Sequence, residues 1–133
     1  MIEKLKEVLI EQGKKFLEEF GEFFPFATAI SFEGKIVPVG IYFGEDNPLS
    51  EEVLLQLETA LKAGKDEKRY KMVGICTNVF VTPPGESDKI DAFELRIDGQ
   101  EIERINIYVP YEVKEGHVDF LKSYSETGSL ILW

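Results

Sequence analysis

Residues able to do covalent chemistry are scarce in this sequence, which holds one cysteine, Cys76, and one histidine, His117. A cysteine nucleophile needs a thiolate and a neighbouring base, whereas Cys76 lies in an apolar run and His117 follows much later, after Gly116. This pair also falls short of a disulfide, a zinc knuckle or a multi-histidine metal site. We therefore predict a buried, structural Cys76, and we expect no catalytic residue, cofactor or metal.

Acidic side chains are unevenly distributed. Residues 44–58 contain no base and carry Glu45, Asp46, Glu51, Glu52 and Glu58. A calcium loop needs oxygen ligands at alternate positions, and Asn47-Pro48 interrupts that spacing. Acidic residues are also expected at the start of a helix, because the helix dipole favours them there. The same charges also predict a docking surface for a basic partner, formed by Glu45, Asp46, Glu51 and Glu52, because uncompensated charge attracts a cationic surface.

A further set of polar residues is expected on one face of a sheet. The alternation of two neighbouring predicted strands places these side chains on the same side, with Cys76 and Asn78 expected beside them on a third strand. The set comprises Arg96, Arg104, Asn106 and Tyr108. Tyr and Arg are enriched at interfaces, so this face is a second candidate recognition surface, although an ordinary solvated sheet face carries the same pattern.

Hydrophobic periodicity predicts the elements that position these residues. Apolar steps of three and four residues indicate a helix over 2–20 and another from Asn47-Pro48 to Gly64, whose buried stripe is Leu49, Val53, Leu57 and Leu61. Alternation indicates strands over 26–32, 37–41, 70–82, 89–97 and 102–111.

The order of these elements predicts an α+β domain spanning residues 1–133. We expect a single antiparallel sheet of about five strands with two main helices, in the order α-β-β-α-β-β-β, similar to a profilin-like or PAS-like layout. A two-residue turn at Glu33-Gly34 would pair Ile30 with Val37, and Pro38 suggests that the second strand is an edge. Residues 117–121 are expected to form a short strand or helix, and the apolar residues 129–133 are expected to be docked on the domain rather than left in water.

The length and the net charge of the chain limit its possible functions. The chain has 133 residues, 44% of them hydrophobic, and a formal net charge of −10, which disfavours nucleic acids and anionic membranes as partners. No glycine-rich phosphate loop opens a helix. The opening residues lack a signal-peptide apolar region, so we expect a cytoplasmic protein.

Four short segments resemble a group of small, uncharacterised bacterial single-domain proteins, over about residues 20–111. They are Phe23-Phe24-Pro25-Phe26-Ala27, residues 34–40 (GKIVPVG), residues 74–79 (GICTNV) and residues 106–111 (NIYVPY). The resemblance implies a bacterial, cytosolic, free-standing domain and supplies no catalytic residue.

Two classes of function follow. The favoured one is a non-catalytic interaction module, immunity-protein-like or chaperone-like, whose negative charge steers it to a basic partner. The alternative is a small-molecule-binding domain or enzyme that uses the concave face of the sheet beneath the second helix.

Overall fold

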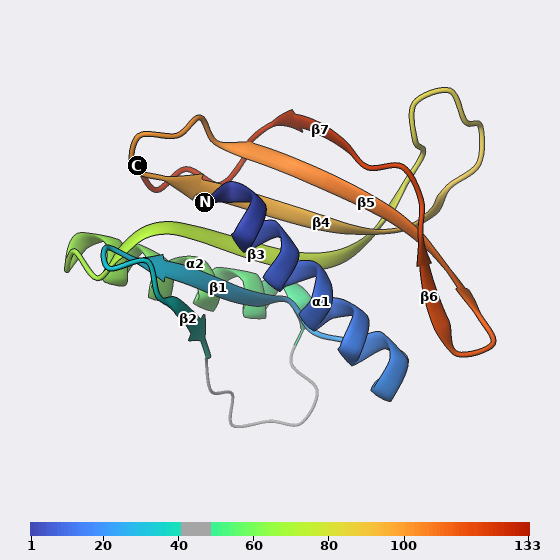
Figure 1. Ribbon diagram of the computed structural model, residues 1–133, viewed down its shortest axis with the longest axis horizontal. Coiled ribbons are helices and arrows are strands. Elements are labelled where there is room, and N and C mark those ends of the chain that lie inside the picture. Colours follow the sequence, from blue (N-terminus) through green and yellow to red (C-terminus); the bar gives the residue numbers. More distant parts are fainter. Residues whose placement is uncertain (41–48) are drawn as a thin grey trace.

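The computed structural model describes residues 1–40 and 49–133 and confirms the α+β class (Figure 1). Its elements are α1 (Ile2–Phe20), β1 (Phe26–Ser31), β2 (Ile36–Val39), α2 (Ser50–Asp66), β3 (Tyr70–Val81), β4 (Ile90–Gly99), β5 (Ile105–Lys114), β6 (His117–Phe120) and β7 (Tyr124–Thr127). Within this part of the chain, no helix is long and apolar enough to cross a membrane.

All strands belong to one antiparallel sheet with the order β2-β1-β3-β4-β5-β6. The expected number of about five strands is too low, because β6 and β7 add to it. Both pair with the same edge of β5: β6 with Tyr111–Lys114 and β7 with Ile105–Tyr108. These two strands are short and mostly exposed. Backbone pairing with β5 holds them in place, and they have no alternating apolar pattern from which they could be predicted.

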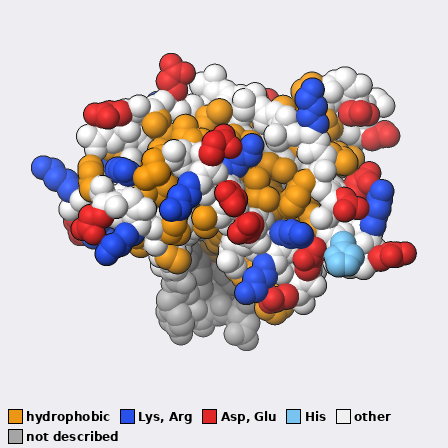
Figure 2. All heavy atoms as spheres, in the orientation of Figure 1, with side chains coloured by type: hydrophobic (Ala, Val, Ile, Leu, Met, Phe, Trp, Pro, Cys, Tyr) orange, Lys and Arg blue, Asp and Glu red, His pale blue; other side chains and the backbone are white. Residues whose placement is uncertain are grey.

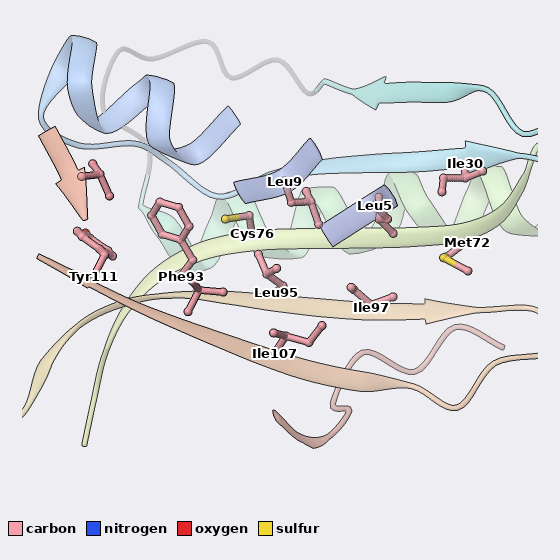
Figure 3. Packing of buried hydrophobic residues seen from close by; sticks show 12 residues of the cluster. Leu5, Leu9, Ile30, Met72, Cys76, Phe93, Leu95, Ile97, Ile107 and Tyr111 are labelled. Carbon is pink, nitrogen blue, oxygen red and sulfur yellow. The ribbon is translucent and has the colours of Figure 1, made fainter. Parts of the chain in front are cut away.

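The two helices cover opposite faces of the sheet (Figure 1). On the α1 side, Leu5 and Leu9 are fully buried against a core that contains Cys76, Phe93 and Leu95 (Figure 3). Burial raises the pKa of the Cys76 thiol well above its usual value, because the thiolate would be desolvated. The predicted burial of Cys76 is thus confirmed.

On the other face, α2 packs Val53, Leu57 and Leu61 onto the sheet. Leu49, predicted to join this stripe, precedes the helix and is exposed. The prediction that Gly64 ends the helix is also wrong, since the helix continues to Asp66. Gly64 lies instead against the buried Tyr70 ring, where an added Cβ would stand 2.1 Å from Cε2, so the glycine permits a close helix–sheet contact.

The first hairpin differs from its predicted register. Ile30 lies opposite Ile36 rather than Val37, because the loop has three residues and Gly34 adopts the left-handed conformation (φ 84°) in it. Val37 therefore shares a face with Ala29 under α2. Shifting a register by one residue moves the whole apolar set to the other face.

The edge position predicted for the second strand is confirmed. Ser31 N–H donates to the Lys35 carbonyl, which makes these residues a hydrogen-bonded pair. Pairs alternate along an antiparallel ladder, so Pro38 occupies a non-hydrogen-bonded position opposite Thr28, with its ring nitrogen on the outer side of the sheet.

Candidate functional site

The α2-side face of β4 and β5 holds the polar set predicted for a recognition surface. Arg96 lies opposite Asn106. Even-numbered residues of β4 therefore lie opposite even-numbered residues of β5, as expected. The expectation for the third strand is wrong: Ile75, not Cys76, lies beside Arg96, and Cys76 and its face-mate Asn78 belong to the α1 side. The β3–β4 register pairs odd residues with even ones, which moves Cys76 to the opposite face.

One half of this face is covered by the C-terminal residues. The Asp98 side chain is 1% exposed, and its Oδ2 accepts N–H groups from Leu132 (2.7 Å) and Trp133 (3.1 Å). Its Oδ1 accepts the N–H of Gly99 at 2.9 Å. A carboxylate that accepts several backbone N–H bonds is strongly held, so Asp98 fixes the end of the described chain on the sheet.

Two of the predicted recognition residues complete this arrangement, which we call the tail clasp (Asp98, Arg104 and Asn106). The Arg104 Nη2 atom donates to the Trp133 carbonyl at 2.6 Å. Asn106 donates through Nδ2 to Ser129 Oγ (3.0 Å) and accepts the Ser129 N–H (3.2 Å). The polar groups of Arg104 and Asn106 thus serve contacts within the chain.

The other half of the face is organised around Glu94. Its Oε1 accepts Arg96 Nε at 2.6 Å and the Thr77 hydroxyl at 3.4 Å, and its Oε2 accepts the Tyr108 hydroxyl at 3.1 Å. Glu58 of α2 adds a longer ion pair to Arg96, at 3.7 Å. Arg96 and Tyr108 are therefore fixed in position by one carboxylate.

Tyr108 connects this network to the end of the sheet. Its ring stacks on Tyr124 of β7, with centroids 5.1 Å apart and planes inclined by 21°. Burial, followed by the nearby Glu94 charge, raises the pKa of Tyr108 to about 12, so its hydroxyl stays a donor at neutral pH. The stack gives Tyr124 a fixed orientation.

Tyr124 forms part of a hollow of about 570 Å³, which we call the sheet-end cleft. It lies between the β3–β4 loop and the base of the β5–β6 hairpin, which project from the same end of the sheet (Figure 1). Its lining residues are Pro83, Pro84, Glu86, Asp88, Ile90, Pro110, Glu112, Leu121, Lys122, Ser123 and Tyr124.

A second hollow, of about 690 Å³, lies where α1 ends. We call it the aromatic groove; it is lined by Phe16, Phe20, Glu22, Phe23, Phe24, Pro25, Phe26 and Ser50. Gly21 caps α1 in the left-handed conformation (φ 77°) and reverses the chain. The residues after the helix therefore return to its last turn.

The described part of the predicted acidic surface, Glu51 and Glu52, lies next to a residue of this groove. Ser50, the first residue of α2, belongs to its lining, and Glu51 and Glu52 follow in the exposed first turn. Glu45 and Asp46 lie outside the described residues. The groove itself was not predicted, although four phenylalanines within residues 20–26 are a usable signal, since such a density of aromatics cannot all enter one core.

Cys76 and His117, weighed above as a nucleophile and its base, are not brought together. His117 is 80% exposed and stands at the surface, 3.9 Å from Glu18 (Figure 2), on a different element from buried Cys76. Residues 1–40 and 49–133 contain no group of three or more His, Cys, Asp or Glu side chains able to hold a metal ion.

Comparison with known proteins adds no further residues. The chain matches no family model, no curated protein and no solved structure. The aromatic groove and the sheet-end cleft are therefore the features of the structure that bear on function.

Proposed function

We propose that this protein is a non-catalytic, cytoplasmic interaction module, immunity-protein-like or chaperone-like, and that its aromatic groove receives an apolar side chain of a basic partner. The observation that carries the proposal is the exposure of two large rings in one hollow: Phe20 is 68% exposed and Phe24 is 46% exposed. Neighbouring exposed aromatics in a concave surface are typical of binding sites rather than of a solvated surface.

The groove is rigid enough to bind without large rearrangement. Phe16 packs edge-on against Phe26 at 5.4 Å, and Phe23 packs against Phe26 and against buried Phe93, both at 5.5 Å. These inner rings are tied to the core, so they lose little freedom on binding. Covering the exposed parts of Phe20 and Phe24 contributes about 1 to 2 kcal/mol for each ring.

The charges around the groove select a basic partner. Glu22 belongs to its lining, which contains no basic residue, and Glu51 and Glu52 follow Ser50 directly. A cation in this place is attracted by the faces of the aromatic rings and by the negative charge of the carboxylates. The net charge of −10 adds long-range steering, which increases the association rate more than the affinity.

The experiment compares matched baits in the capture of partners from a bacterial lysate. The groove variant is the double substitution Phe20→Ser/Phe24→Ser, and the control is Phe80→Ser, which removes a 72% exposed ring outside the groove. We expect a partner that binds wild type and the control but binds the groove variant at least about tenfold more weakly. Its association should slow markedly between about 50 and 500 mM salt, and Glu51→Gln/Glu52→Gln should slow it further.

Two results would contradict this function. One is a specific partner whose affinity is unchanged by the groove variant and whose association ignores salt. The other is a melting temperature that falls much further for the groove variant than for Phe80→Ser, because rings that stabilise the free fold are not available to a partner.

A further inference from the structure

The sheet-end cleft has a chemical character different from that of the aromatic groove. Its wall and floor include three prolines, Pro83, Pro84 and Pro110, together with Ile90 and Leu121. Its volume of about 570 Å³ falls in the range of small-molecule sites. Its apolar lining would contact the body of such a ligand.

The backbone offers the cleft few hydrogen-bond donors, and its side-chain donors come from Lys122, Ser123 and Tyr124. Proline has no backbone N–H, and two other lining amides donate within the chain: Glu86 N–H to the Pro83 carbonyl (3.0 Å) and Leu121 N–H to the Pro110 carbonyl (2.8 Å). Carboxylates, which only accept when ionised, come from Glu86, Asp88 and Glu112. The three carboxylates supply acceptor oxygens to which a ligand N–H group can donate.

Charge and aromatic contact point to the same class of ligand. Three carboxylates face one lining ammonium, Lys122; Glu112 also contacts Lys114 at 3.4 Å, but as an exposed pair that water screens. The Tyr124 ring is held by its stack on Tyr108, whose hydroxyl is bound by Glu94. A fixed aromatic ring among carboxylates is suited to an ammonium or guanidinium group.

From the apolar cleft, its excess of carboxylates over ammonium groups and its fixed tyrosine, we infer that the sheet-end cleft binds a small organic cation: an amine or guanidine with an apolar body. The apolar body lies over Ile90 and Pro110, and the cationic head donates to Asp88 and Glu112. The lining of this site shares no residue with the lining of the aromatic groove, so the two sites can be tested separately.

The test uses the purified chain alone, with three probes that share one body: 4-phenylbutylamine, 4-phenylbutan-1-ol and 4-phenylbutyrate. Titration followed by amide chemical shifts should show the amine binding with a dissociation constant of about 1 mM and perturbing Ile90, Ser123 and Tyr124. The alcohol should bind about fivefold more weakly because it lacks the charge, and the carboxylate should not saturate the cleft.

Variants separate the cleft from the general negative charge of the molecule. Asp88→Asn/Glu112→Gln should weaken the amine about fivefold and leave the alcohol unchanged. Glu7→Gln, an exposed residue of α1, should change neither affinity. The inference is overturned if amine and alcohol bind equally, if the shifts map elsewhere, or if the cleft variant behaves like the α1 control.

Discussion

The tail clasp permits a quantitative prediction at Asp98. In Asp98→Asn, the side-chain amide has one acceptor oxygen and one NH₂ group. In one orientation the NH₂ group faces the N–H groups of Leu132 and Trp133, and in the other it faces the N–H of Gly99. In both cases a donor meets a donor, and hydrogen bonds that the carboxylate accepts are lost. Breaking charge-assisted bonds to a buried carboxylate costs about 1.5 to 3 kcal/mol each.

The total loss is limited because the tail can detach. Releasing residues 129–133 restores their conformational entropy, so the loss cannot exceed the free energy with which the tail docks, and it corresponds to one or two of these bonds. We therefore expect a net loss of about 3 kcal/mol in the free energy of unfolding and a fall in melting temperature of about 10 °C.

Trp133 reports this change directly, because it is the only tryptophan. In Asp98→Asn its emission should shift to the red, and the amides of Leu132 and Trp133 should lose protection against hydrogen exchange before the rest of the sheet does. The matched control is Asp119→Asn, which removes the same charge from an exposed position on β6 and should change neither signal. Unchanged emission and exchange in Asp98→Asn would refute the reasoning that Asp98 holds the tail.

Three further predictions follow from packing and burial. Gly64→Ala should lower the free energy of unfolding by about 2 kcal/mol in a urea titration, since the new Cβ meets the buried Tyr70 ring; an unchanged midpoint would show that the ring moves freely. Cys76 should resist a thiol reagent at neutral pH and react after unfolding, because burial raises its pKa; rapid native labelling would contradict this. Burial also raises the pKa of Tyr108 and Tyr111 to about 12. The unfolded chain therefore releases these protons at lower pH than the folded chain, and the free energy of unfolding should fall as pH rises from about 10 towards 12. Denaturant midpoints at each pH measure this, and a midpoint that rises across the interval would refute the prediction.

Local patterns predicted the elements well where one face of the sheet is buried. The odd-numbered apolar residues of β4 and β5 meet as expected, with Leu95 opposite Ile107. The first hairpin was misread because both of its faces carry apolar residues under a helix, so the pattern could not distinguish a two-residue turn from a three-residue loop.

Long-range contacts explain what the sequence did not reveal of the candidate sites. The shared face of Arg96, Asn106 and Tyr108 follows from strand alternation and was predicted. The bonds from Asp98 to Leu132 and Trp133 join residues 34 and 35 positions apart and leave no local signal. The pair Asp98-Gly99 is typical of a turn, yet Asp98 lies in β4 and its side chain is buried.

The outward nitrogen of Pro38 limits how this protein can meet other chains. An added strand on β2 would find no N–H at this position of a short edge, so its ladder would be interrupted at once. Pro38 therefore disfavours growth of the sheet in this direction, whether by recruiting a peptide strand or by pairing copies edge to edge. A partner at this edge would gain less from backbone pairing than from contacts with side chains.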